Sequence, residues 1–108
     1  MHSEQELVKK GAANLQRGIE TVGGMLFLRH EDIEFRPHKL NVQTNNLVLK
    51  VSKITSVEKC WVKFLNLIPL FPNAIKVNVE DGEFVFVVFG RKEWISAIES
   101  CRSSNGRK

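Results

Sequence analysis

The sequence predicts a mainly β protein, in which about seven antiparallel strands form a small barrel and a C-terminal α-helix closes it. Apolar residues recur at every second position along most of the chain, and this is the period of a β-strand. An Asp-Gly pair at residues 81 and 82 separates two such runs, as in a β-hairpin. One run with helical spacing follows near the C-terminus.

The composition is that of one folded domain with a mild preference for acidic partners. The chain has 108 residues, of which 43% are hydrophobic and 26% charged, so it has room for a single core. It contains 16 Lys and Arg residues against 12 Asp and Glu residues, which gives a formal charge of +4. That excess favours nucleic acid phosphates or anionic lipid head groups, yet it falls short of the dense basic stripe of a nucleic-acid binder.

The two ends of the chain are polar and read as extensions of the domain. We expect a polar N-terminal segment over 1–11, one domain over 12–102 and a polar tail over 103–108. The N-terminal segment lacks the apolar centre of a signal peptide, and no apolar run reaches the roughly 20 residues that span a bilayer. We therefore expect a cytoplasmic protein, with peripheral attachment to membranes as an alternative.

The first half of the chain predicts strands separated by turns and loops. Gly18 ends the first alternating run, Gly23 and Gly24 open the second, and Pro37 ends the third because proline lacks a ladder donor. Polar residues before and after the third run read as a turn and a loop. The expected strands are 13–17, 25–29, 33–36, 47–51 and 54–63.

The second half predicts a hairpin followed by the closing helix. Strands over 75–80 and 83–89 flank Asp81-Gly82, where both residues tolerate a positive φ. The far face of the second strand is apolar as well as the near one, so it needs a cover that the helix is expected to supply. The near face carries Phe84, Phe86 and Val88, and the far face carries Val85, Val87 and Phe89.

The predicted helix, 91–102, carries an apolar stripe. Gly90 is placed to cap its N-terminus, and Trp94, Ile98 and Cys101 recur at spacings of four and three. Polar residues from 103 onward predict its end. Cys101 and Cys60 lie far apart and without metal-ligand spacing, so we expect two buried thiols.

The order of several short motifs resembles that of the GRAM domain family. The run GMLFLRHEDIEF from Gly24 to Phe35 is similar to the family signature: glycine, any residue, leucine, aromatic, aliphatic, threonine, three variable residues, aliphatic, any residue, phenylalanine. Residues 54–57 look like the family's aliphatic-x-serine-valine block, and Trp94 looks like the tryptophan of its closing helix. Arg29 departs from the pattern, because threonine is usual there.

This resemblance covers roughly residues 12–101 and carries its own implications. It implies a pleckstrin-homology-like architecture, in which two packed antiparallel sheets of seven strands are capped by a helix. It also implies a non-catalytic module that binds lipids, phosphoinositides or protein segments and holds no cofactor.

Two groups of basic residues are candidates for binding an anion. Lipid-binding pleckstrin-homology domains place bases in and around the loop between their first two strands, whereas this loop, 19–23, has one acid and no base. The alternative is a charged strand edge that resists pairing with other chains. The candidates are Arg17 and Arg29 beside the loop, and Arg36, His38 and Lys39 after the third strand.

An apolar loop between two expected strands is the candidate interaction surface. Loops usually avoid such a composition, because exposed apolar patches favour association. The loop either folds under the barrel as a lid, binds a protein or a second copy of the chain, or dips into a membrane interface. Its candidate residues are Phe64, Leu67, Ile68, Leu70 and Phe71.

We expect a binding module and not an enzyme. His30 and Asp32 have no further metal ligand in a recognised spacing, and no nucleophile or phosphate-loop pattern occurs. A protein or a second copy is the expected partner, anionic lipid is the first alternative, and no small-molecule substrate is expected. Nucleic acid is the second alternative, for which Trp61 with Lys59 and Lys63 is the candidate surface.

Overall fold

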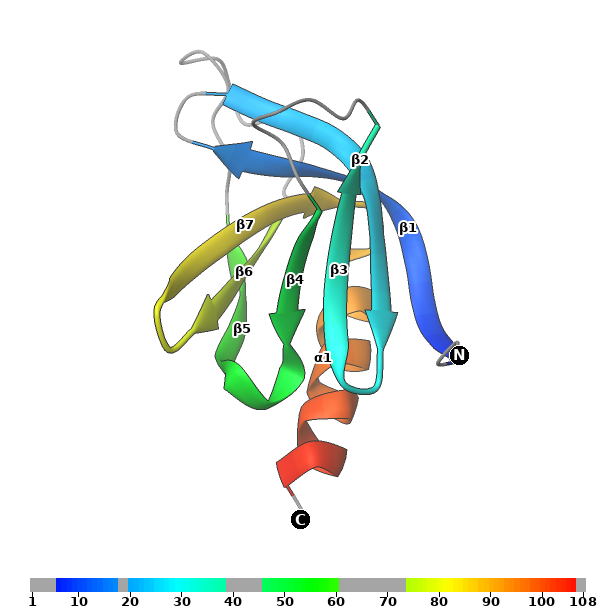
Figure 1. Ribbon diagram of the computed structural model, residues 1–108, viewed down its shortest axis with the longest axis vertical. Coiled ribbons are helices and arrows are strands. Elements are labelled where there is room, and N and C mark those ends of the chain that lie inside the picture. The colour runs from blue at the N-terminus through cyan, green and yellow to red at the C-terminus, as the bar shows by residue number, and fades with distance from the viewer. Residues whose placement is uncertain (1–5, 18–19, 39–45, 61–73, 107–108) are drawn as a thin grey trace.

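A computed structural model describes residues 6–17, 20–38, 46–60 and 74–106 of the chain. Four strands precede a short 3-10 helix, η1, and three strands follow it. One α-helix then ends the described chain (Figure 1). The elements are β1 (Leu7–Arg17), β2 (Glu20–Arg29), β3 (Asp32–Pro37), β4 (Leu47–Lys50), η1 (Val51–Lys53), β5 (Ile54–Cys60), β6 (Ala74–Val79), β7 (Gly82–Val88) and α1 (Arg91–Gly106).

The strands form one antiparallel sheet in the order β4-β3-β2-β1-β7-β6-β5. This confirms the predicted class of seven antiparallel strands and a C-terminal helix, although the sheet is continuous and not divided in two. The sheet curls, and α1 runs behind it toward the C-terminus (Figure 1). The two end strands, β4 and β5, are linked through η1 and share no strand pairing in the described residues.

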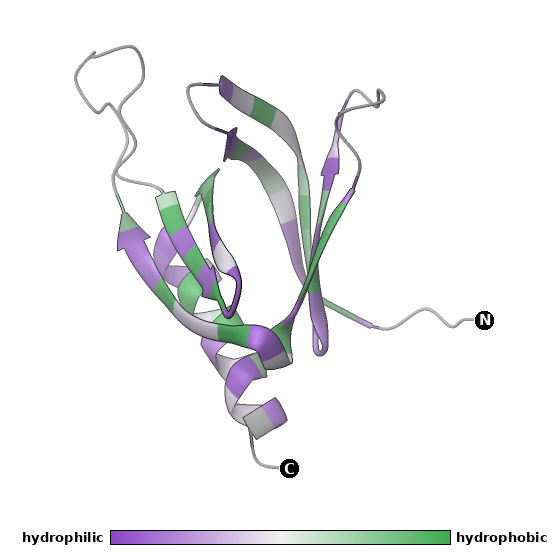
Figure 2. Cartoon of the chain, turned by 60° about the vertical axis from the view of Figure 1, so that its left-hand side comes forward, coloured by the Kyte–Doolittle hydropathy of each residue, from purple (hydrophilic) through white to green (hydrophobic). Residues whose placement is uncertain are grey.

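The core lies on the inner side of the curled sheet. Hydrophobic and hydrophilic residues alternate along the strands (Figure 2), so each strand turns one apolar row inward. Three side chains of α1 complete the cluster: Trp94, Ile98 and Cys101. The largest fully buried side chains from the strands are Leu26, Leu28, Ile33, Phe35, Ile75, Val77 and Phe86.

Trp94 anchors α1 against the inner side of β1. Its side chain is 2% exposed, and a Cβ added to Gly11 would lie 3.5 Å from Trp94 Cζ2. Lys9 lies on the same side, with its Nζ 5.2 Å from the centroid of the Trp94 ring. Gly90 precedes the helix with φ 71°, and its carbonyl accepts the N–H of Trp94 at 3.0 Å. The predicted stripe and cap of this helix are confirmed.

The surface that α1 covers differs from the expected one. The helix joins the cluster that contains Phe86 and Val88, so it packs on the near face of β7. The far face keeps its contact with solvent: Val85 and Val87 are half-buried and Phe89 is 79% exposed. The expectation that α1 shields this far face is wrong, because the helix closes the inside of the curled sheet instead.

Several element bounds also differ from the sequence-based expectation, and β2 is one of them, because it begins at Glu20 and runs through Gly23 and Gly24. Strand β1 begins at Leu7 and pairs with β2 along its length, six residues before the expected start. The tight turn lies at Glu80-Asp81, because Gly82 already pairs with Val79. Helix α1 continues through residues 103–106, where Asn105 Nδ2 donates to the Cys101 carbonyl at 2.9 Å and to the His30 carbonyl at 2.8 Å.

Truncation of the anchoring tryptophan tests this account of the closure. Trp94→Ala is expected to lower the free energy of unfolding by about 3–5 kcal/mol, because it empties a large buried site. Urea denaturation followed by circular dichroism measures this change. A loss below about 1 kcal/mol would show that the helix does not depend on this side chain.

A glycine in β2 allows the close approach of β3. A Cβ on Gly24 would collide with the backbone carbonyl of Arg36 and would lie 2.8 Å from both Phe35 Cζ and Pro37 Cα. Gly24→Ala is therefore expected to cost at least about 1–3 kcal/mol in unfolding free energy, as overpacked sites do. Gly82→Ala is the matched control, because a Cβ there meets no atom within 4 Å. Equal stability of the two variants in urea denaturation would contradict the steric argument.

Candidate functional site

Two of the candidate anion-binding arginines meet at a carboxylate on the outer face of β2 and β3. Strand alternation places Asp32, Glu34 and Arg36 on that face of β3, and Arg29 reaches it from the end of β2. Arg29 Nη2 donates to Glu34 Oε1 at 3.0 Å. Arg36 donates to the other oxygen through Nε at 2.9 Å and to Oε1 through Nη2 at 3.2 Å. Asn46 Nδ2 adds a further bond to Glu34 Oε2 at 2.7 Å.

Glu34 is ionised and neutralises the arginines that surround it. The residue is 9% exposed, and it is the buried charged residue of the described core. Hydrogen bonds from Arg36, then from Arg29 and Asn46, hold the pKa of the Glu34 carboxyl below its ordinary value, against the opposing effect of burial. Arg29 also pairs with Asp32 at 2.9 Å. Two guanidinium groups thus meet two carboxylates, and the cluster has no net charge.

An aromatic ring fixes the two guanidinium groups in place. Phe27 lies opposite Glu34 in the β2–β3 pairing, on the same outer face. The Arg36 Cζ is 4.5 Å from the Phe27 ring centroid, and the Arg29 Cζ is 6.0 Å from it. Such stacking is worth about 0.5–1 kcal/mol at exposed sites. The arginines are therefore held in place by contacts within the chain.

The other candidate anion-binding residues do not join this cluster. Arg17 is exposed at the end of β1, opposite Glu20 at the start of β2. His38 is exposed after β3, and its backbone N–H donates to the Gly23 carbonyl at 2.9 Å. Lys39 lies outside the described residues. Sequence reasoning missed Glu34, although the alternation of β3 puts it on the same face as Arg36.

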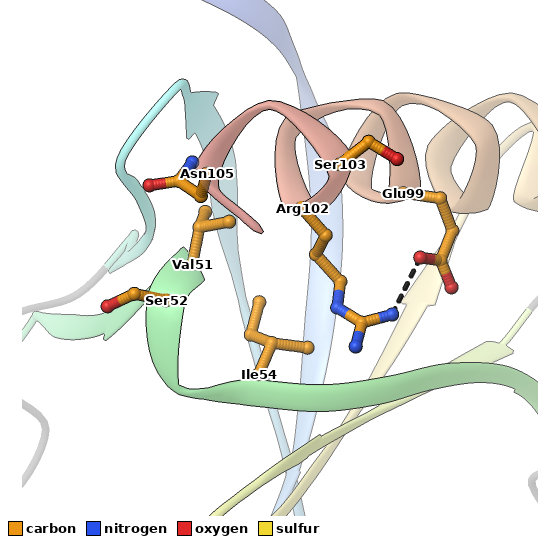
Figure 3. A pocket seen from close by; sticks show the side chains of 7 residues that line it. All are labelled: Val51, Ser52, Ile54, Glu99, Arg102, Ser103 and Asn105. Carbon is orange, nitrogen blue, oxygen red and sulfur yellow. Dashed lines mark hydrogen bonds and ion pairs between the residues drawn. The ribbon is translucent and has the colours of Figure 1, made fainter. Parts of the chain in front are cut away.

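An open pocket of about 410 Å³ separates η1 from the end of α1 (Figure 3). Arg102 points from α1 toward β5, with Ile54 below it and Glu99 at its side (Figure 3). Its Nη1 is 2.7 Å from Glu99 Oε1, and its Nη2 donates to the Thr55 carbonyl at 2.9 Å. The complete lining is Val51, Ser52, Ile54, Glu99, Arg102, Ser103 and Asn105.

The arginines of α1 protect the edge of the sheet. Strand β5 is an end strand of the sheet, and among the described elements no strand pairs with its outer backbone groups. Arg102 binds the Thr55 carbonyl, and Arg91 Nη1 donates to the Cys60 carbonyl at 3.4 Å. Charged groups on an edge strand discourage pairing with another chain. We therefore assign the Arg102 side of the pocket a structural role.

Neither cysteine of the described residues carries an activated thiol. Burial raises the pKa of both the Cys60 and the Cys101 thiols, which keeps them protonated and weakly nucleophilic. Asp32 accepts a hydrogen bond from Arg29 Nη1 at 2.9 Å. Within the described ranges no group of three His, Cys, Asp or Glu residues is placed to hold a metal ion.

Several predicted interaction residues cannot be placed. The apolar loop residues Phe64, Leu67, Ile68, Leu70 and Phe71 lie outside the described residues. Trp61 and Lys63, two of the three candidates for nucleic acid binding, also lie outside them. In the part of the chain that is described, no helix is long and apolar enough to cross a membrane. The large apolar side chains exposed there are Leu7, Val8, Val48 and Phe89.

Comparison with solved structures identifies the fold. No protein-family model matches the chain, and no curated protein matches its sequence. The C-terminal domain of an unknown protein from Leishmania infantum superposes with a TM-score of 0.71 at 18% identity, covering 91% of this chain and 84% of that one. The N-terminal PH domain of human ARAP2 superposes with a TM-score of 0.68 at 17% identity, covering 97% and 86%.

The linker-DH/PH domains of p115-RhoGEF give a TM-score of 0.72 at 14% identity, covering 94% of this chain and 30% of that one. Seven antiparallel strands followed by a C-terminal helix therefore make this a pleckstrin-homology-like fold. At these identities the similarity defines the fold alone. What the domain binds must be argued from its own side chains.

The Glu34 cluster predicts a specific dependence of stability on pH. Because the folded-state pKa of Glu34 is depressed, its stabilising contribution is present above the unfolded-state pKa of about 4 and is lost as the pH falls through the folded-state value. Glu34→Gln is expected to lower the free energy of unfolding by about 1.5–3 kcal/mol at neutral pH. The difference in unfolding free energy between this variant and wild type should become smaller as the pH falls.

Urea denaturation of both proteins from neutral to acidic pH measures this effect. Glu83→Gln is the matched control, because Glu83 is exposed and its oxygen is 3.9 Å from Lys76 Nζ. The control should stay close to wild type at every pH. A constant gap between wild type and Glu34→Gln over the whole pH range would refute the assigned ionisation.

Proposed function

We propose that this chain is a non-catalytic binding module of the GRAM and pleckstrin-homology-like kind, and that its partner is a protein or a second copy of itself. One observation carries the choice of partner. The arginines best placed to bind an anionic head group, Arg29 and Arg36, already hold the buried carboxylate of Glu34. A lipid phosphate would have to compete for these arginines with a carboxylate that belongs to the fold.

Two features support the finer comparison with GRAM domains. Gly24, the first residue of the signature-like run, permits the close packing of β3 against β2. Trp94 occupies the buried anchor position of the closing helix. Arg29 stands where threonine is usual in that family, and here it is the residue that reaches both Asp32 and Glu34. This departure supports a site that differs from a lipid-binding one.

Anionic lipid is the alternative that the family resemblance raises, and nucleic acid is the second. Both ligands need cations with unused donors that converge on a phosphate. Arg17 and His38 are exposed, but Arg17 lies opposite Glu20 and neither of the two joins the arginine cluster. Arg17 and His38 therefore give little support to the lipid alternative. The pairing of Arg29 and Arg36 with Glu34 argues against it more strongly.

Vesicle co-sedimentation distinguishes the partner classes. Wild type is expected to bind vesicles of phosphatidylserine or phosphatidylinositol bisphosphate in phosphatidylcholine no better than phosphatidylcholine alone. Glu34→Gln should bind the anionic vesicles more strongly than wild type, because Arg36 loses its carboxylate partner and Arg29 keeps only Asp32. That variant also shows that the assay detects an available site.

The lipid alternative makes the opposite prediction. Strong binding of wild type to the anionic vesicles, removed by Arg36→Glu, would overturn a protein-binding function. A salt-sensitive change in tryptophan emission on titration with single-stranded oligonucleotides would favour nucleic acid. Sedimentation equilibrium at rising protein concentration then separates a second copy from a different protein as the partner.

A further inference from the structure

The corner where β7 meets α1 presents an aromatic side chain to solvent. Phe89 is 79% exposed, the highest value among the large apolar residues described. Gly90 follows with φ 71°, and a Cβ there would approach Glu93 Oε1 to 3.0 Å. This glycine lets the chain leave β7 and enter α1 directly after Phe89. The fold therefore fixes the backbone of Phe89 while it leaves the ring uncovered.

Phe89 extends an apolar row on the outer face of the sheet. The pairing of β7 with β1 ends at Val88 with Ala13, and Phe89 and Ala12 are the residues that continue the two segments beyond that pair. Ala12 in turn lies opposite Met25 of β2. Ala12 is exposed, whereas Met25 and Val87 are half-buried. We call Ala12, Met25, Val87 and Phe89 the Phe89 patch.

Exposed cations outnumber carboxylates at the corner that holds the Phe89 patch. The two segments that meet at this corner, 9–15 and 86–92, contain four cations and no carboxylate. Lys10 lies on the outer face two residues before Ala12, and Lys92 is exposed in the first turn of α1. Lys9 lies on the inner side over Trp94, and Arg91 binds the Cys60 carbonyl. One carboxylate shares this corner, because Glu93 Oε1 lies 3.0 Å from the position of a Cβ on Gly90.

The form of the patch favours a protein over a membrane. Met25 and Val87 are half-buried, so Phe89 offers the most accessible apolar side chain of the patch. An apolar face with one exposed aromatic residue fits the side of a peptide segment, and aromatic side chains are frequent anchors of protein interfaces. The rim of lysines adds selection by charge.

We propose that the Phe89 patch docks an acidic segment with an apolar face, contributed by a protein partner. This inference rests on the proposed protein-binding function and names the surface that performs it. Phe89 supplies the buried contact, and Lys10 and Lys92 pair with carboxylates at its rim. The neutral Glu34 cluster borders the patch, since Arg36 lies opposite Met25 in the sheet.

Peptide selection tests the inference. A phage library of random peptides is selected on immobilised wild-type protein, and the enriched sequences are synthesised and titrated by fluorescence anisotropy. We expect them to combine acidic and apolar residues. Phe89→Ser and Lys10→Glu/Lys92→Glu should each weaken their binding about tenfold or more. Circular dichroism melting checks that both variants remain folded, as exposed substitutions should.

Matched controls come from the other end of the sheet. Val48 is 53% exposed on β4, three strands away from β1, and Val48→Ser should leave peptide binding unchanged. Lys50→Glu/Lys53→Glu removes the same charge from exposed positions there and should weaken binding far less than Lys10→Glu/Lys92→Glu.

The outcomes separate the surface from the general function. Enriched peptides that bind Phe89→Ser as tightly as wild type, or that lack acidic residues, would overturn the Phe89 patch and leave protein binding standing. Failure to enrich any peptide, together with binding to anionic vesicles, would overturn both proposals. Vesicle binding that Phe89→Ser abolishes would make this corner a membrane contact and would equally refute a protein partner there.

Discussion

Closure of the curled sheet by one helix is the constraint on which the rest of this structure depends. The end strands β4 and β5 do not pair in the described residues, so hydrogen bonds alone leave the barrel open. Helix α1 contacts β5, η1, β1 and β6 from the inner side, and Trp94 supplies its largest buried group. Burial of that apolar surface holds the two ends of the sheet around one core. Because α1 lies inside, the outer face of the sheet is left for other contacts.

A buried carboxylate changes what the basic residues on that outer face can do. In the sequence alone, Arg29 and Arg36 resemble an anion-binding site because they are two cations at the ends of neighbouring expected strands. Glu34 already accepts bonds from both, and the surrounding contacts keep it ionised. The arginines therefore add no net charge to this face, whereas Lys10, which lies opposite Phe27 in the β1–β2 pairing, is exposed beside them. Charge alone is a poor guide to a binding site when the counter-charge is part of the fold.

Periodicity predicted most of the fold because one face of the sheet meets the apolar core and the other face meets water. The strands, their antiparallel character and the buried stripe of α1 all follow from apolar residues at spacings of two or of three and four. The turn between β6 and β7 did not follow from periodicity. A turn at Asp81-Gly82 would pair Val77 with Phe86, and the observed turn pairs Val77 with Phe84. Both registers keep the same faces inward, so the pattern cannot choose between them.

Contacts between distant segments decide three features: the register of β6 and β7, the side of the sheet that α1 covers, and whether the arginines are already paired. The Glu80 N–H donates to the Lys53 carbonyl at 3.2 Å, which ties the β6–β7 turn to η1. The sequence by itself determined the class of fold and the inward residues, because local spacing decides which side chains can share a face. Only the tertiary structure decided that α1 leaves Phe89 exposed and that Glu34 occupies the arginines. Those outcomes depend on which face of the sheet the helix reaches and on cross-strand distances, neither of which is encoded in local spacing.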